Sequence, residues 1–575
     1  MASSAASTLA DVSELIAIIL SFLDNRSLAT SARVCKRWKE IALDLLWREV
    51  DDLHRLFTTL SPYRKPMKKL DGGRTIQSYK FRKRVTKNDT RLWMPYASRV
   101  RRLVFDERSP KYRTKVIDNS VFFDCSMAKL HHLGGILPNL QSLVWHVHRW
   151  DSQLKCMTFM HKTVREFDVE IHPTIKAGDD INYVWQMGTM MPDLTHLTLR
   201  RGGPLSQVEA HFCSAFKMLP KLQKVVLPCC SSTNNIMEAL SHLKDLQELI
   251  LAGPNEGRCT ADFADVASFA PALCEGAFPA LKRMSFSSPL PAATLFIQSP
   301  FFPATITRLY VHLTATAEPA SLRELLSVIA RRCPDLVDLV IDFIMCPATT
   351  LGAVPPLDAR PSITTFRPLF TCRQLTSFEF RWDYPLHLYD HDMHEFAAAW
   401  PGIEQLMLNS EAVLEMTPSP LTLASLIPFA EHCPRLRQLG LYIDADVMPT
   451  DPIDGPFQSL RKLSVGASSI TAADPVALFL SQLCSPCCEI VSGFRWPDAY
   501  GIALDNAGIF DERRARICEF WVRWNEVQKI LPVVVRARME ERDRCLGGRS
   551  PGSGTPELMA NRSLTGSPRQ DILCD

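Results

Sequence analysis

The sequence predicts an α/β protein. A small three-helix module at the N-terminus precedes a curved array of strand–helix units, with the parallel sheet inside and the helices outside, and a disordered tail follows. Two patterns predict this fold. Residues 9–50 carry apolar residues at helical spacing, and one short apolar pattern recurs between residues 100 and 465. The apolar fraction, 46% of 575 residues, is that of a globular chain and excludes wholesale disorder.

A first helix is expected around residues 15–23. Apolar side chains surround nearly its whole circumference, relieved only by Glu14 and Ser21. A helix that is apolar on all sides must be covered on all sides, and a module of about 40 residues is too small to do this alone. We therefore expect either the rest of the chain or a second protein to cover it.

A second helix is expected after the break at Asp24–Ser27, with Ser27 as its N-cap. Its apolar stripe comprises Leu28, Val34, Cys35, Trp38, Ile41 and Ala42, with basic residues off the stripe. Leu45, Leu46 and Trp47 are expected to form a short third helix.

The order of these segments resembles the F-box. The segments concerned are Ser21-Phe22-Leu23-Asp24, Leu28, Val34-Cys35-Lys36-Arg37-Trp38 and Leu46-Trp47. The chain departs from the family at Asp11–Ser13, where the Leu-Pro pair that usually opens the first helix is missing. The resemblance implies that the module binds a small Skp-family adaptor, which connects to a cullin scaffold and a ubiquitin-conjugating enzyme.

The same resemblance implies which residues contact the adaptor: Leu15, Ile16, Ile19, Leu20, Leu23, Leu28, Val34 and Trp38. Val34 and Trp38 have a second interpretation, in which they belong only to the core of the module itself.

The recurring pattern consists of an apolar residue, two residues, an apolar residue, one residue and a third apolar residue. Leu140/Leu143/Trp145 and Leu194/Leu197/Leu199 are two of its thirteen occurrences, which have a mean spacing of 30 residues. The last two apolar residues are two apart and therefore share one face of a strand. A proline often precedes the pattern and ends the helix before it, as at Pro192.

Each unit is thus a helix, a proline-marked turn and a short strand. This resembles the leucine-rich repeat family in a long, irregular, helix-backed form, and the match covers roughly residues 100–490. With the F-box at the start, the whole layout resembles the large fungal F-box families. A non-repeating α/β enzyme with leucine-rich strands is the alternative.

Near the end of the chain, apolar residues at 517, 520, 521, 524 and 527 predict a helix that caps the last repeat, and Pro532 is expected to end or kink it. The residues after 546 are rich in Gly, Ser and Pro and are expected to be disordered. The predicted organisation is a disordered N-terminus (1–8), the F-box (9–50), a basic linker or N-terminal cap (51–98), the repeats (99–495), the capping helix (496–546) and the disordered tail (547–575).

Composition excludes several classes of protein. No apolar run is long enough to span a membrane, no secretory signal is evident, and the glycine-rich loops of nucleotide-binding folds are missing. The 18 cysteines are too dilute for a disulfide scaffold and predict reduced thiols in the cytoplasm or nucleus. We expect no cofactor.

Three further groups of residues have the composition of sites. Residues 64–115 hold 18 Lys/Arg against 4 Asp/Glu, with interleaved aromatic residues. This favours a solvated strand edge, with a surface for an acidic protein partner or for nucleic acid as the alternatives. His387, His391 and His394 with Asp390 and Asp392 have the spacing of metal ligands but favour a polar surface helix. Cys484, Cys487 and Cys488 carry half of a zinc spacing and favour buried thiols.

The sequence therefore predicts a non-catalytic substrate receptor of a cullin-type ubiquitin ligase, without metal or membrane, that holds an unknown protein target on its repeats. Three alternatives stay open. They are an adaptor-bound scaffold or regulator outside any ligase, a nucleic-acid-associated protein that uses the 64–115 segment, and a thiol enzyme built on Cys484 or Cys487.

Overall fold

The computed structural model describes residues 13–546, with gaps at 72–73, 128–134, 148, 172–176, 202–204, 206–207, 253–262, 316–317, 344–354, 383, 413–418, 451–452, 454 and 494–509. The segments predicted to be disordered, 1–8 and 547–575, lie outside the described residues.

The chain divides into two compact units between Arg283 and Met284. Each unit is built around a parallel sheet with helices packed against it. The array predicted over 99–495 includes residues of both units. The apolar pattern is the same on both sides of the division, so it carries no signal for the boundary.

The main sheet of the first unit consists of parallel strands. A separate, smaller sheet near the start of the unit is described below. In spatial order the strands are β1 (Glu49–Val50), β4 (Arg102–Asp106), β6 (Ser142–His146), β7 (Glu166–Ile171), β8 (His196–Arg201), β9 (Lys224–Leu227) and β10 (Glu248–Leu251).

The recurring apolar residues stack in register across this sheet. Leu143 of β6 pairs with Leu103 of β4 on one side and with Phe167 of β7 on the other. Two residues further on, Trp145 pairs with Phe105. All five side chains are buried. The predicted strands, and the prediction that both apolar positions face the core, are therefore confirmed here.

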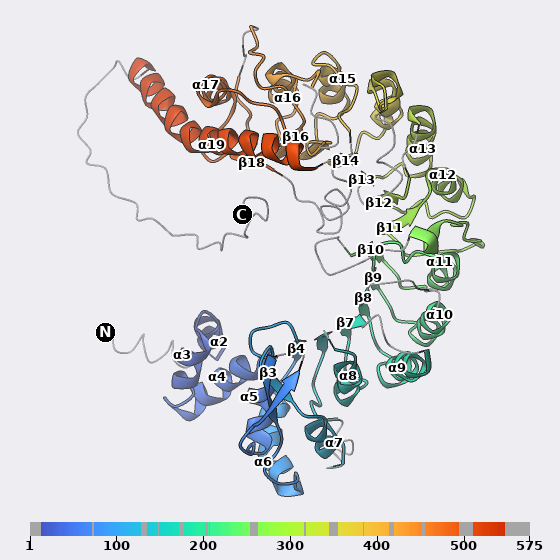
Figure 1. Ribbon diagram of the computed structural model, residues 1–575, viewed down its shortest axis with the longest axis vertical. Coiled ribbons are helices and arrows are strands. Elements are labelled where there is room, and N and C mark those ends of the chain that lie inside the picture. Colours follow the sequence, from blue (N-terminus) through green and yellow to red (C-terminus); the bar gives the residue numbers. More distant parts are fainter. Residues whose placement is uncertain are drawn as a thin grey trace. The chain divides into compact units, whose positions relative to one another are not determined.

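Helices of the first unit fill the connections between strands. They are α2 (Ser13–Ser21), α3 (Asn25–Ser31), α4 (Lys36–Arg48), α5 (Leu53–Leu60), α6 (Lys87–Ala97), α7 (Asn119–Met127), α8 (Trp150–Gln153), α9 (Ala177–Met190), α10 (Glu209–Met218) and α11 (Asn234–Ser241). Figure 1 shows α9, α10 and α11 along one side of strands β7 to β10. The parallel sheet of this part of the unit is thus flanked by helices.

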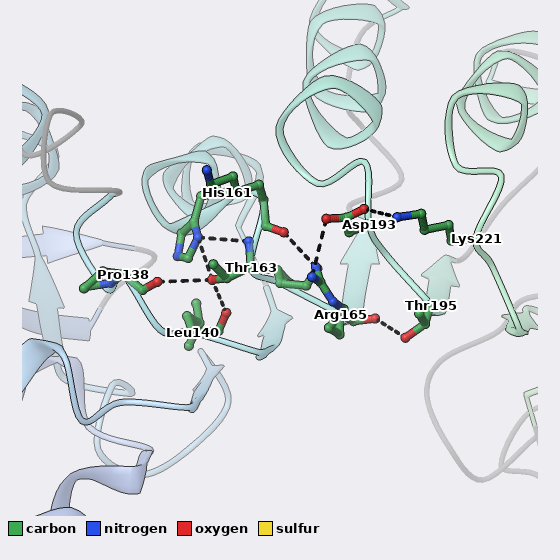
Figure 2. A network of polar contacts seen from close by, with 10 residues as sticks. Pro138, Leu140, His161, Thr163, Arg165, Asp193, Thr195 and Lys221 are labelled. Atoms are coloured by element: carbon green, nitrogen blue, oxygen red, sulfur yellow. Dashed lines mark hydrogen bonds and ion pairs between the residues drawn. The ribbon is translucent and has the colours of Figure 1, made fainter.

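The turns that lead into consecutive strands are joined by polar side chains (Figure 2). Thr163 Oγ1 donates a hydrogen bond to the carbonyl oxygen of Leu140 (2.7 Å). The carboxylate of Asp193 pairs with the guanidinium of Arg165 (3.4 Å) and with Lys221 Nζ (2.6 Å). Each turn is thus tied to the turns before and after it, which keeps the neighbouring strands in register.

The segment predicted as a basic linker or cap, 51–98, is folded. It contains α5, α6 and two strands of a second sheet, in which β2 (Met67–Asp71) pairs antiparallel with β3 (Arg74–Tyr79), and β3 pairs in parallel with β5 (Lys115–Ile117). Helix α5 buries an entire face, comprising Leu53, Leu56, Phe57 and Leu60. The segment therefore forms part of the first unit.

The second unit repeats the strand–helix pattern. Its strands are, in spatial order, β11 (Arg283–Ser288), β12 (Arg308–Leu313), β13 (Asp338–Asp342), β14 (Ser377–Arg381), β15 (Gln405–Leu408), β16 (Gln438–Leu441), β17 (Lys462–Gly466) and β18 (Glu489–Ser492). Its helices are α12 (Leu290–Gln298), α13 (Pro319–Arg332), α14 (Ile363–Phe366), α15 (Asp392–Ala399), α16 (Ile427–His432), α17 (Ala473–Leu483) and α19 (Phe510–Leu546).

Helix α19 covers the edge strand β18 of the sheet of the second unit. Its side chains Ile517, Trp524 and Val527 are buried, as the apolar spacing predicts. Trp524 Nε1 donates to the carbonyl oxygen of Ser468 (2.9 Å) beyond β17, and the backbone N–H of Ile490 in the edge strand β18 donates to the Gln528 side chain. An edge strand covered in this way is protected from pairing with another chain.

Of the two outcomes expected at Pro532, an end or a kink of the helix, the first does not occur, because α19 continues through Pro532 to Leu546. Leu531 and Val535 on either side of the proline are buried, and this packing outweighs the lost backbone hydrogen bond. Among the described residues, no helix combines the length and apolar character needed to cross a membrane.

Candidate functional site

The N-terminal module has a small core of its own. Ile16 and Leu20 of α2 pack with Leu28 of α3 and Ala42 of α4, and all four are buried. Half-buried side chains complete this cluster: Ala32, Trp38, Ile41, Leu45 and Leu46. One face of α2 is therefore covered by the module itself.

The neighbouring face of α2 is apolar and exposed. Leu15 and Leu23 are each 37% exposed, Ile18 is 56% exposed, Ile19 58% and Phe22 84%. Relative to Leu15 these residues follow at i+3, i+4, i+7 and i+8, the spacing that places side chains on one side of a helix. We call these five residues the exposed apolar face. A cluster of exposed apolar side chains marks an interaction surface, whereas single ones do not.

The turn after α2 extends this face beyond the end of the helix. The backbone N–H of Phe22 donates to the carbonyl of Ile19 (3.3 Å), and Ser21 Oγ donates to the carbonyl of Ile18 (2.7 Å). The chain therefore keeps winding for one more turn, and Phe22 and Leu23 stay on the same side as Ile18 and Ile19.

Helix α3 begins with a different cap from the one predicted. Asp24, and not Ser27, is the N-cap, and its carboxylate accepts a hydrogen bond from the backbone N–H of Ser27 (2.8 Å). Hydrogen bonds from Ser27 lower the pKa of Asp24. Both residue types are good caps, and Asp24 lies one residue before the first helical position, where a cap must be.

The predicted second and third helices are also divided differently. A turn after Ser31 separates α3 from α4, and Cys35 is the N-cap of α4, with its sulfur accepting from the backbone N–H of Trp38 (3.5 Å). Leu45 to Trp47, predicted as a third helix, form the last turns of α4. Val34 lies in the turn and is 63% exposed, so its assignment to the core is wrong.

The predicted adaptor contacts fall into two groups. Leu15, Ile19, Leu23 and Val34 are exposed. Ile16, Leu20 and Leu28 are buried, and Trp38 is half-buried against them. The three buried residues are covered by their own module and support the exposed apolar face from beneath, and direct contact of the eight residues with an adaptor stays a prediction.

Two exposed residues were missing from that prediction, Ile18 and Phe22. Their spacing from Leu15 could have identified them, since i+3 and i+7 belong to the same stripe as i+4 and i+8. The remaining surface at the start of α4 is basic, with Arg33, Lys36 and Lys39 exposed.

The basic segment 64–115 does not present its aromatic residues for stacking. Phe81 is 7% exposed and Trp93 is fully buried. Several of its cations are already paired with carboxylates, as in Lys80–Asp118 (3.3 Å) and Lys83–Asp89 (3.0 Å). Single-stranded nucleic acids are bound through exposed aromatic rings beside free cations, so this geometry favours a structural role.

The histidine group does not converge as metal ligands would. Only His394 lies within α15; His391 is its N-cap, and His387 precedes the helix. Asp390 accepts hydrogen bonds from the backbone N–H (2.8 Å) and Oγ1 (2.7 Å) of Thr422, so it serves the turn.

The prediction of buried thiols holds for two of the three cysteines in the group. Cys484 and Cys488 are buried, while Cys487 is exposed. The hydrogen bond with Cys488, together with burial, raises the pKa of the Cys484 thiol. A protonated thiol is a poor nucleophile, which disfavours Cys484 as the centre of a thiol enzyme.

Comparison with known proteins identifies one segment. Residues 13–52 match the family described as F-box-like. This range begins at the first residue of α2 and ends just beyond β1, so it contains α2, α3 and α4 together with the exposed apolar face. No curated protein matches the chain.

Proposed function

We propose that this chain is a non-catalytic F-box substrate receptor. In this proposal the module at residues 13–52 binds a Skp-family adaptor, and the remainder of the chain presents a protein target for ubiquitination. The observation that carries the proposal is the exposed apolar face on a segment that matches the F-box-like family. F-box domains bind Skp-type adaptors.

The two faces of α2 explain why a partner is needed. Ile16 and Leu20 fold the module, and this leaves Leu15, Ile18 and Ile19 in water. Covering a large aliphatic or aromatic side chain contributes about 1.5–3 kcal/mol relative to leaving it exposed. The five residues of the exposed apolar face therefore gain most when a second protein covers them together.

Charge favours a partner with an acidic rim. Arg33, Lys36 and Lys39 surround the start of α4, next to the exposed Val34. Acidic groups on the adaptor opposite these cations would speed association and fix its orientation, and they would add less to the affinity than the apolar contacts.

The rest of the chain is proposed to hold the target. Its strand–helix units, with stacked apolar rows and ladders of polar side chains, are proposed to be irregular leucine-rich repeats of the fungal F-box type. The adaptor would bring a cullin scaffold and the ubiquitin-conjugating enzyme, in the cytoplasm or nucleus. The contribution of the receptor would be proximity, which raises the effective concentration of enzyme and target.

Co-purification tests the proposal. The tagged full chain is expected to retain a Skp-family adaptor, and through it a cullin, while the Ile19→Asp variant retains neither. A point variant is preferable to deletion of residues 9–50, because that deletion removes β1, whose Glu49 and Val50 pair with β4. Retention of the adaptor without any cullin would instead support a scaffold or regulator outside the ligase.

A further inference from the structure

The side chain of Arg99 connects the F-box module to the first sheet. Its guanidinium pairs with the carboxylates of Glu40 and Asp44 on α4, and Nη1 also donates to the carbonyl oxygen of Glu40 (3.1 Å). Its Nε donates to the carbonyl of Pro95 in the last turn of α6 (3.0 Å). The Arg99 side chain is 15% exposed, whereas the side chains of Glu40 and Asp44 are 61% and 64% exposed, so the guanidinium is the sheltered partner of these contacts.

The position of Arg99 also offsets the repulsion between two carboxylates on α4. Glu40 and Asp44 are four residues apart on one side of the helix, and like charges at this spacing destabilise a helix. The Arg99 guanidinium lies between them and reverses this repulsion. It also lies near the C-terminal end of α6, where a cation is favoured by the helix dipole.

An aromatic contact beside Arg99 joins the same two parts. Trp47, in the last turn of α4, is 6% exposed and packs against Tyr96 of α6, with ring centroids 5.5 Å apart. The guanidinium of Arg55 in α5 lies 4.9 Å from the Trp47 ring centroid, within the range of a cation–π interaction. Arg55 also donates to the carbonyl of Leu46 (3.4 Å).

The backbone completes the connection without a flexible linker. Helix α4 ends at Arg48, and the next two residues form β1. Val50 of β1 pairs with Leu103 of β4, and the N–H of Arg101 donates to the carbonyl of Arg48 (2.9 Å). A ladder of only two residues is short, so side-chain contacts are needed to hold the angle between α4 and the sheet.

We infer that Arg99 is a positioning residue: it fixes the direction in which the exposed apolar face points relative to the sheet of the first unit. The consequence for ubiquitination rests on the proposed function, because a receptor must hold adaptor and target in a set orientation. Arg99 makes its contacts with the middle of α4 and with α6, and none of these partners belongs to the exposed apolar face. Its loss changes orientation and leaves adaptor affinity intact.

Hydrogen exchange of the full chain, without adaptor, tests the inference at the Arg101 amide. Arg99→Ala is expected to speed exchange of this amide about fivefold to tenfold, the effect of losing a multidentate charged contact. Amides of β8 should keep their rates. The control Arg33→Ala removes an exposed arginine of the same module and is expected to leave the Arg101 amide unchanged.

Charge reversal separates positioning from general packing. Arg99→Glu alone is expected to speed exchange at Arg101 further, and Arg99→Glu combined with Glu40→Arg is expected to restore much of the parent rate. Electron-paramagnetic distance measurement between labels at Thr30 and Lys217, both exposed in the first unit, should give one narrow distribution for the parent and a broader one for Arg99→Ala.

An unchanged exchange rate and an equally narrow distance distribution in Arg99→Ala would overturn the inference, as would a parent whose distribution is already broad. Neither measurement involves the adaptor. If the parent fails to bind a Skp-family adaptor, the proposed function is wrong. The role of Arg99 in orienting the module is still decided by the exchange rate of the Arg101 amide and by the distance distribution.

Discussion

Ile16 and Ile19 lie three residues apart on helix α2 and have different surroundings. Ile16 is 3% exposed and packs with Leu28 and Ala42, whereas Ile19 is 58% exposed. The same residue type thus stabilises the module at one position and is left for a partner at the other. Substitutions at these two positions should separate folding from binding.

Truncating Ile16 should destabilise the module, and truncating Ile19 should not. Ile16→Ala removes buried methyl groups and is expected to cost about 2–4 kcal/mol of module stability. Ile19→Ala, at an exposed position, is expected to stay within about 0.5 kcal/mol of the parent. Denaturant-dependent hydrogen exchange of the α2–α4 amides in the full chain measures both. Equal effects at the two positions would contradict the two-faced description of α2.

Ile18 and Phe22 should contribute to adaptor binding although the family resemblance did not single them out. Phe22 is the most exposed large apolar residue of the face, at 84%. Phe22→Ala and Ile18→Ala are each expected to weaken the affinity for a Skp-family adaptor about tenfold or more, without lowering stability. Calorimetric titration checks this, with Thr30→Ala on the exposed side of α3 as control. Full affinity in both variants would place the contact elsewhere.

Trp524 should be a principal anchor of α19 on the second unit. Its side chain is 1% exposed, and its indole N–H is bonded to the Ser468 carbonyl. Trp524→Ala is expected to destabilise this unit by about 3–5 kcal/mol, seen as earlier exchange of the β17 and β18 amides in denaturant. The matched control is Trp185→Ala, because Trp185 is 58% exposed and its loss should cost about 0.5 kcal/mol or less.

His161 should make the first unit less stable in mild acid. Burial lowers its pKa below the ordinary value of 6.5, although the hydrogen bond to the Leu137 carbonyl opposes this. Nε2 donates to that carbonyl (2.7 Å). Nδ1 accepts from the backbone N–H of Thr163 (3.4 Å) and lies 2.9 Å from Thr163 Oγ1 (Figure 2).

The sign of the effect follows from this depressed pKa. Above pH 6.5 both the folded and the unfolded chain keep His161 neutral, and its stabilising contribution is complete. Below that value the unfolded chain binds the proton first, so stability is lost as the pH falls toward the folded pKa. Burial lowers the pKa of His54 in the same way. Denaturant titrations above and below pH 6.5 should show this loss, and His161→Gln should reduce it without abolishing it.

The sequence predicts the strands well because each one depends on a local pattern. Leu143 and Trp145 are two apart and buried in register with their neighbours, as any strand with one core face requires. Periodicity fails at α2 because a helix with apolar residues on every side gives no preferred face. Only the packing of Leu28 and Ala42 determines that Ile16 turns inward and Ile18 outward.

Other differences arise from contacts distant in the sequence. Pro532 looks like a helix end, yet buried Leu531 and Val535 carry α19 past it. The sequence leaves the 51–98 segment open between a basic linker and a cap, because its charges dominate its composition and the buried face of α5 repeats too briefly to stand out. The contact of Arg99 with Glu40 and Asp44 joins residues more than fifty positions apart, and no local pattern predicts it.

Titration of a purified Skp-family adaptor into the full chain and into its Ile19→Asp variant tests the central claim most directly. The parent is expected to bind, and the variant is expected to remain folded and lose binding, because a charge at position 19 would be buried without a partner only in the complex. An equal affinity for both chains, or no binding by the parent, would contradict the account.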